Sequence, residues 1–181
     1  MIATMPQRRA RLARLQRQRG ASLLEAIAYL GVAALVVLAA VSLLQNAFGS
    51  ARSNQTTEEI TGLRTNVRKM YAGQSYDDDT MLANMVTAKA IPGTLSVAAD
   101  QTIKNTWGGA VTVAKVDAAS FKISYASVPQ DVCMNVVSGA TGWTRIAGAS
   151  DATPITVFPA AAADAAALCN AASNTIVFTA D

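Results

Sequence analysis

Hydrophobic residues dominate one long stretch of the chain, from Ala26 to Leu44. This stretch carries no charge, and Ser42 is its only clearly polar side chain. At about 1.5 Å per residue, its 19 residues would form a helix of roughly 28 Å, which matches the roughly 30 Å hydrocarbon core of a bilayer. A helix satisfies its backbone hydrogen bonds internally, so such a segment can lie in lipid. The pattern predicts a membrane-embedded helix.

An amphipathic pattern continues this helix beyond the apolar run. Four apolar residues recur at spacings of three, four and three, namely Ile60, Leu63, Val67 and Met70. This spacing places them on one face of a helix. The stripe needs a surface to cover it, and we expect that surface to be a sheet of the same chain. Glycine is common just after a helix end, so Gly73 marks the end of one predicted helix over residues 22–72, roughly 75 Å long.

The remaining chain alternates between short β-like runs and short helical segments. Alternation of apolar with smaller or polar residues is typical of half-buried strands. It is clearest at Val111, Val113, Phe121, Ile123 and Tyr125. The expected strands cover residues 94–98, 110–116, 120–126, 143–147, 155–158 and 175–180. The expected short helices cover residues 79–90, 128–137 and 159–172. This mixture predicts an α+β fold with a mainly antiparallel sheet.

Two polar motifs lie between these elements. The acidic run at residues 77–79 lacks the spacing and the closing glutamate of an EF-hand. We therefore interpret it as a loop in which Asp79 caps the following helix. The sequence at residues 105–109 reads as a turn before a strand. For Trp107, packing beside this turn is favoured over contact with a receptor.

Charge is unevenly distributed along the chain. Glu25 is the first acidic residue, and six arginines precede it, namely Arg8, Arg9, Arg11, Arg14, Arg17 and Arg19. This bias should keep the N-terminus in the cytoplasm and send the later part across the membrane. The net charge of +3 belongs to the whole chain and does not describe the part after Gly20. That part carries nine basic and twelve acidic side chains. That part has a net charge of −3, which gives no support for nucleic-acid binding.

The absence of histidine and the presence of two cysteines limit the possible chemistry. Ser-His-Asp and Cys-His sites and His-ligated metals are excluded. Cys133 and Cys169 lie beyond the apolar run, in the part expected to reach an oxidising compartment, and they form no CxxC motif. A disulfide is therefore favoured over a metal or redox site, and two buried free thiols are the alternative.

The junction between the basic segment and the apolar run carries a family resemblance. An ordinary secretory signal has an apolar core of about 7–15 residues followed by a small-residue cleavage site. Here the apolar run is longer, the small pair Gly20-Ala21 precedes it, and Glu25 follows that pair closely. This order resembles the processing site of type IV prepilins. The 20-residue leader is similar to those of the type IVb branch.

The resemblance implies roles for the residues at this junction. A prepilin peptidase would cut between Gly20 and Ala21 and methylate the new amino terminus at Ala21. The Glu25 carboxylate would pair with the terminal amine of a neighbouring subunit during assembly. Helix chemistry offers a second explanation, in which Ser22 and Glu25 form a capping box.

The resemblance also implies a domain organisation. Residues 1–20 would be the cleaved leader, and residues 21–50 the hydrophobic half of the helix, used in the membrane and in assembly. Residues 51–181 would be the head domain, with the amphipathic half of the helix packed on it. Type IVb pilins close a C-terminal loop with a disulfide, which implies the same bond between Cys133 and Cys169 here.

The implied function is that of a structural subunit, not of an enzyme. The chain would be a major pilin, inserted in the bacterial inner membrane and polymerised through its helix into a surface filament. Its partners would be further copies, the prepilin peptidase and the pilus assembly machinery, with no cofactor, metal, catalytic residue or nucleic acid involved. The filament would serve adhesion, aggregation or conjugative mating contact. A minor pilin or type II secretion pseudopilin is the main alternative, and a membrane-anchored periplasmic enzyme is a weaker one.

Overall fold

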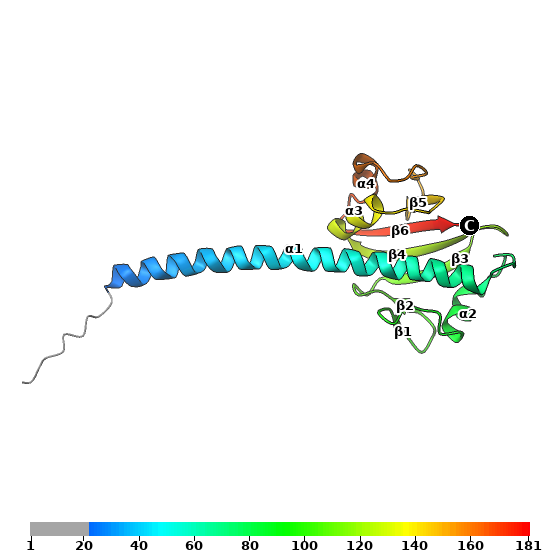
Figure 1. Cartoon of the computed structure of the whole chain (residues 1–181), viewed down its shortest axis with the longest axis horizontal. Coiled ribbons are helices and arrows are strands. Elements are labelled where there is room, and N and C mark those ends of the chain that lie inside the picture. The colour runs from blue at the N-terminus through cyan, green and yellow to red at the C-terminus, as the bar shows by residue number, and fades with distance from the viewer. Residues whose placement is uncertain (1–21) are drawn as a thin grey trace, which may run out of the picture. The chain divides into compact units, whose positions relative to one another are not determined.

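The computed structural model of the chain describes residues 22–181, with only the backbone described at Gln45 and Asn46. Its internal contacts divide the chain into two compact units, of which the first ends at Leu43 and the second is Leu44–Asp181. Helix α1, Leu23–Met70, begins in the first unit and ends in the second (Figure 1). The predicted long helix is therefore confirmed to within two residues at each end.

The second unit is built on a sheet. In the described residues this sheet has six strands in the order β1-β2-β3-β4-β6-β5, and all neighbours are antiparallel. The strands are β1 (Ser96–Val97), β2 (Ile103–Lys104), β3 (Ala110–Lys115), β4 (Phe121–Pro129), β5 (Arg145–Gly148) and β6 (Ser173–Ala180). The shorter helices are α2 (Met81–Thr87), α3 (Gln130–Ser138) and α4 (Ala162–Leu168). The predicted α+β fold with an antiparallel sheet is confirmed.

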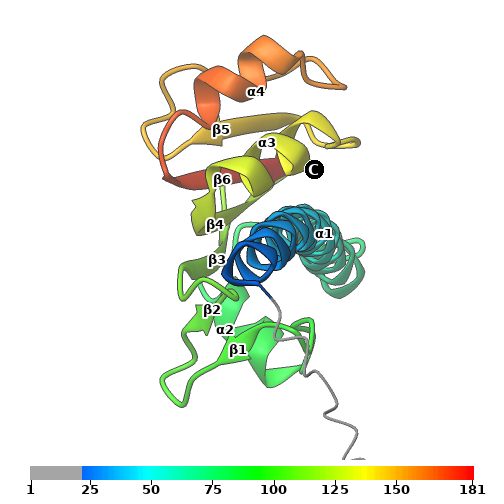
Figure 2. The same cartoon turned by 90° about the vertical axis from the view of Figure 1, so that its left-hand side faces the viewer.

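One face of the sheet is covered by the part of α1 that belongs to the second unit (Figure 2). The side chains on this face alternate along β4 as predicted, because Phe121, Ile123 and Tyr125 are buried. Ile123 is the centre of this layer, since it pairs with Val113 of β3 and with Phe178 of β6. The predicted helical stripe is also confirmed: Ile60, Leu63 and Val67 are buried and Met70 is half-buried.

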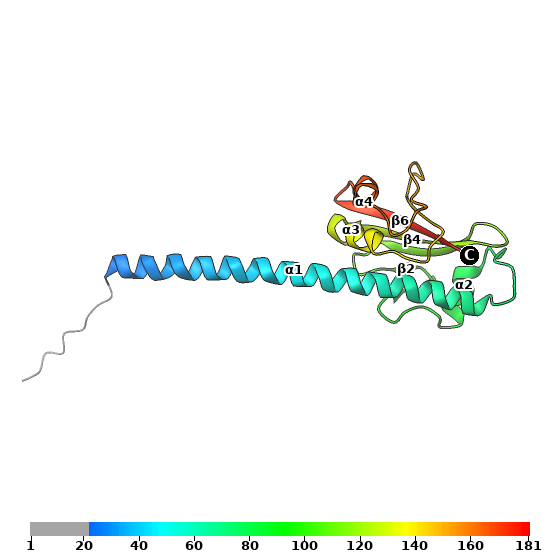
Figure 3. The same cartoon turned by 45° about the horizontal axis from the view of Figure 1, so that its top comes forward.

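The short helices lie at opposite edges of the sheet (Figure 2). Helix α2 packs against β3, and α3 packs against α4, β4 and β6. The C-terminal end of β6 lies beside the end of α1 (Figure 3). There, Arg68 Nε donates a hydrogen bond to the main-chain oxygen of Asp181 at 2.6 Å.

Three sequence-based expectations were wrong in detail. The strand expected at residues 155–158 is a single bridge, in which Ile155 pairs with Ile146 of β5. Proline lies on both sides of this segment, at 154 and 159, and proline cannot donate to a strand ladder. Strand β2 was missed, because two residues carry no visible alternation. Helices α2 and α4 are shorter than their predicted ranges, and α4 ends where Cys169 (φ −98°, ψ 50°) leaves the helical conformation.

Candidate functional site

The start of α1 holds the described part of the predicted assembly site. Gly20 and Ala21, the expected cleavage and methylation residues, lie outside the described residues. Glu25 is in the first turn of α1 and is exposed. Its Oε1 accepts a hydrogen bond from the Tyr29 hydroxyl at 3.4 Å, one helical turn further on. Ser22 contributes its carbonyl, which accepts from the Ala26 amide at 3.0 Å. The contacts found here are therefore not those of a capping box.

The surface of α1 that follows Glu25 is apolar on every side. All residues from 22 to 44 are exposed, and the large apolar ones include Leu30, Leu35 and Leu38. A helix that is apolar all round is normally buried in a protein core or in a membrane. Among the described residues, α1 is the one helix long and apolar enough to cross a bilayer. This exposed surface requires a lipid or protein environment.

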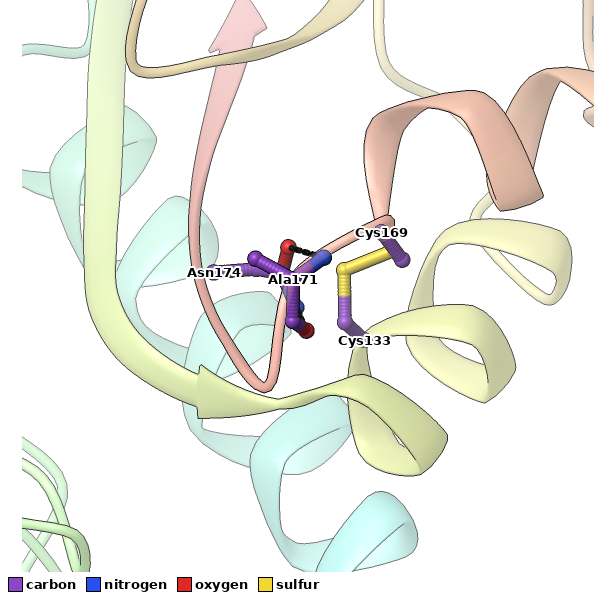
Figure 4. The surroundings of a disulfide bond; sticks show 4 residues. All are labelled: Cys133, Cys169, Ala171 and Asn174. Carbon is purple, nitrogen blue, oxygen red and sulfur yellow. Dashed lines mark hydrogen bonds between the residues drawn. A yellow bond between two sulfur atoms is a disulfide. The ribbon is translucent and has the colours of Figure 1, made fainter.

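The disulfide predicted between Cys133 and Cys169 is confirmed. Cys133 lies on α3 and Cys169 directly follows α4, with Cα atoms 5.8 Å apart and both side chains buried (Figure 4). Beside this bond, Asn174 fixes the turn that leads into β6. Its Oδ1 accepts from the Ala171 amide at 3.2 Å, and its Nδ2 donates to the Ala171 carbonyl at 2.7 Å. The bond joins two helices that are connected in sequence only through β5 and its loops.

The acidic run at residues 77–79 is a loop, as predicted, but Asp79 does not cap α2, whose N-cap residue is Thr80. Asp79 and Asp77 both pair with Lys115 of β3, at 3.2 and 2.7 Å. Asp78 instead accepts hydrogen bonds from the Tyr71 hydroxyl at 2.5 Å and from the amide and hydroxyl of Thr80 at 2.7 Å. The Tyr71 bond, followed by those from Thr80, lowers the pKa of Asp78 to about 2. The loop is thus tied by its own carboxylates to Tyr71, which directly follows α1, and to β3.

The turn at residues 105–109 is organised by the buried side chain of Asn105. Its Oδ1 accepts from the amides of Trp107 at 3.1 Å and Gly109 at 2.8 Å, and its Nδ2 donates to the Ala126 carbonyl at 2.7 Å. A Cβ on Gly109 would overlap the Ala126 carbonyl, so this approach requires glycine. Trp107 is half-buried and packs against the core, as expected.

A polar group that the sequence did not reveal lies under α1. Three polar residues continue the buried face of the helix toward its N-terminus, namely Ser53, Thr56 and Glu59. Ser53 and Thr56 donate to main-chain carbonyls of their own helix. Glu59 is only 2% exposed, and it accepts hydrogen bonds from the Tyr125 hydroxyl and from Gln55 Nε2. Burial, and then the bond to Glu59, raises the pKa of Tyr125. In the sequence, the one sign of this buried group was the presence of polar residues on a helix face that is otherwise apolar.

These arrangements suit a structural role. Within residues 22–181, no group of three or more His, Cys, Asp or Glu side chains could hold a metal ion. The buried Glu59 is paired with a tyrosine inside the core, where no substrate would reach it. The described residues form a domain stabilised by a disulfide, ion pairs and buried hydrogen bonds, together with an exposed apolar helix.

Comparison with known proteins identifies a matching family and similar solved structures. The family model described as PilS N terminal matches residues 50–181. The crystal structure of a type IVb pilin from Salmonella typhi is similar, with 26% identity over 68% of this chain and 94% of that chain and a TM-score of 0.54. The NMR structure of the type IVb pilin PilS from Salmonella typhi has 22% identity over 70% of this chain and 94% of that chain, with a TM-score of 0.46. No curated protein sequence matched the chain.

Proposed function

This chain belongs to the PilS family, and from that premise we propose that it is the major structural subunit of a type IVb pilus. The precursor is held in the bacterial inner membrane by the apolar half of α1, with its head domain in the periplasm. A prepilin peptidase cuts between Gly20 and Ala21 and methylates Ala21. The assembly machinery then polymerises the subunits into a surface filament.

One observation supports this proposal most. The residues from 22 to 44 form an exposed apolar helix, joined to residues that match the PilS family. Burying roughly 1,000 Å² of such surface is worth about 25 kcal/mol relative to water, before the entropy costs of association. Relative to lipid the gain is small, because acyl chains solvate the helix as well as another helix does. The driving force for extraction from the membrane must therefore come from the assembly machinery.

Glu25 is the residue that would form an ion pair with a neighbouring subunit during assembly. A carboxylate at the edge of an apolar helix is costly in a water-free core unless it is paired. The free amine at Ala21 of a neighbouring subunit supplies the opposite charge. The intramolecular partner in the structure, the Tyr29 hydroxyl, is neutral, and at 3.4 Å its hydrogen bond is long. An ionic partner from another subunit would stabilise the buried carboxylate far more.

The first experiment tests processing. Sheared surface filaments should contain this subunit as their main component, with an N-terminus at Ala21 that carries one methyl group. Gly20→Val should leave the unprocessed chain in the inner membrane. If the chain is a minor pilin or a pseudopilin, it will be processed in the same way but will be scarce in the filaments. An intact Met1 in surface material would contradict the proposal.

The second experiment separates the charge of Glu25 from its other contacts. Glu25→Gln keeps a hydrogen-bonding side chain but removes the negative charge, so it should be processed normally and build no filaments. Tyr29→Phe is the matched control, because it removes the contact seen within the chain and should leave piliation unchanged. Filaments are counted by electron microscopy beside a blot for the processed subunit. Normal piliation with Glu25→Gln would refute the ion-pair role.

A further inference from the structure

No atom in the described part of the chain accepts a hydrogen bond from the Arg64 side chain. Its guanidinium lies over the indole ring of Trp143, with Cζ 4.9 Å from the ring centroid. Its Nε is buried, and no described atom accepts a hydrogen bond from it. Arg68, one turn later on α1, is different, because it donates to the main-chain oxygen of Asp181 and pairs with its carboxylate at 3.8 Å. An unsatisfied buried donor is costly. Because Nε is closed to solvent, the donors that a ligand can reach are the terminal nitrogens of the guanidinium.

The guanidinium borders a cavity of about 190 Å³, which we call the Arg64 pocket. Its floor is apolar and buried, and consists of Ile60, Val136, Ala140, Trp143 and Phe178. Its rim is exposed and carries the hydroxyl side chains of Thr57, Thr61 and Thr141. At about 30 Å³ for each water molecule, the space equals that of several waters. The Arg64 pocket can therefore admit a small organic group.

The backbone of Gly142 lies close to the Arg64 guanidinium. Gly142 has a φ of +74°, and a Cβ on it would lie 2.7 Å from an Arg64 terminal nitrogen. The guanidinium therefore lies against both this glycine and the Trp143 ring. Such a planar donor group matches the two oxygens of a carboxylate and loses little side-chain entropy on binding.

The charge in the Arg64 pocket limits the ligand to a monoanion. Burial lowers the pKa of Arg64, the nearby positive charge of Arg68 lowers it further, and Asp181 partly offsets both effects. Arg68 is already paired with Asp181, so one positive charge faces the cavity. A dianion such as phosphate would remain half-neutralised over an apolar floor, which is unfavourable. A carboxylate with a short apolar chain satisfies both the cation and the floor.

We propose that the Arg64 pocket binds a carboxylate group that carries a short apolar chain. The carboxylate accepts hydrogen bonds from the Arg64 guanidinium, and the chain lies on the buried floor. Its source is a free organic acid or an acidic side chain of a second copy. The second source rests on the proposed assembly into filaments, whereas binding by the isolated chain does not.

The test is a titration of the full chain in detergent with propionate, followed by NMR of the tryptophan indole N–H groups. Trp143 should show a saturable shift, and Trp107, which is not in the pocket, should stay unchanged and serve as the internal control. Arg64→Gln should weaken propionate binding about tenfold or more, because a charge-assisted pair is lost. Arg52→Gln is the control, because this exposed arginine does not line the pocket, and it should bind propionate like the unchanged chain.

Two results would overturn the proposal. One is the absence of a saturable Trp143 shift in the unchanged chain, and this result needs no variant to fold. The other is equal binding by the unchanged chain and by a folded Arg64→Gln variant. Arg64→Lys keeps the charge without the planar donors, so it should bind with intermediate strength.

Assembled filaments distinguish the two sources. If an acidic side chain of a second copy fills the Arg64 pocket, filaments should not take up propionate although the detergent-solubilised chain does. If the ligand is a free acid, filaments and solubilised chain should bind it alike. Both outcomes support a carboxylate site. A failure to form filaments would count against the proposed function and leave the result on the solubilised chain intact.

Discussion

The hydroxyl of Tyr125, on an interior strand of the sheet, donates a hydrogen bond to the buried carboxylate of Glu59 on α1. The two residues are 66 positions apart in the sequence. Gln55 donates a second hydrogen bond to the other carboxylate oxygen at 2.8 Å. This contact helps to hold α1 on the sheet, because a shift or rotation of the helix would separate the hydroxyl from the carboxylate.

Tyr125→Phe should therefore lower the free energy of unfolding of the head by about 1–3 kcal/mol, since it leaves a buried carboxylate oxygen without its donor. The measurement is urea unfolding of the detergent-solubilised chain, followed by tryptophan fluorescence. Tyr76→Phe is the matched control, because no described residue bonds to the Tyr76 hydroxyl, and its effect should stay within about 0.5 kcal/mol. Equal effects of the two substitutions would show that the Glu59 contact contributes no stability.

Asp78 should make the head sensitive to acid in a defined range. Its pKa is lowered from 3.8 to about 2 in the folded chain, so its contribution is complete above the unfolded value and is lost as the pH falls from about 4 to about 2. Asp78→Asn should reduce the loss of stability over this range, whereas Asp164→Asn, on the exposed face of α4, should not. Carbon NMR of the Asp78 carboxyl gives the titration directly. A midpoint near 4 would contradict the hydrogen bonds described here.

Loss of the disulfide should destabilise the head strongly. The bond closes a loop with a sequence separation of 36, so replacing both Cys133 and Cys169 by alanine should cost about 2–5 kcal/mol. Reduction of the unchanged chain should give a similar loss in urea unfolding, and this serves as the control for cavity effects of the substitutions. Two thiols per chain, labelled in unreduced and denatured protein, would show that the bond is absent.

Gly109→Ala tests the turn built on Asn105. The new methyl group would overlap the Ala126 carbonyl and lie 2.7 Å from the Ser127 Cβ, so the turn must move away from β4. We expect a loss of about 1–3 kcal/mol, typical of forced overpacking. Gly93→Ala is the matched control, because a Cβ there meets no atom within 4 Å. If both variants unfold at the same urea concentration, the close approach of the turn to β4 is not important for stability.

The sequence by itself determined the features that depend on local spacing. The apolar run and the stripe of Ile60, Leu63 and Val67 define α1, because a helix brings every third or fourth residue to one face. The alternation along residues 121–125 defines β4 in the same way. The bond between Cys133 and Cys169 was predicted from the expected oxidising compartment, the absence of a CxxC motif and the family resemblance. The helix and strand signals are local. The tertiary structure only had to bring the apolar face of the helix against the sheet.

The tertiary structure decided the features that depend on contacts between distant segments. The sheet order places β6 between β4 and β5, so the last strand in the sequence is an interior strand. The buried carboxylate of Glu59 is satisfied because Tyr125 and Gln55 supply its donors, whereas Arg64 Nε is buried with no acceptor among the described residues. A polar side chain on a helix has the same local pattern whether it faces solvent or the core. Only the groups brought opposite it by folding determine whether its charge and its hydrogen bonds are satisfied.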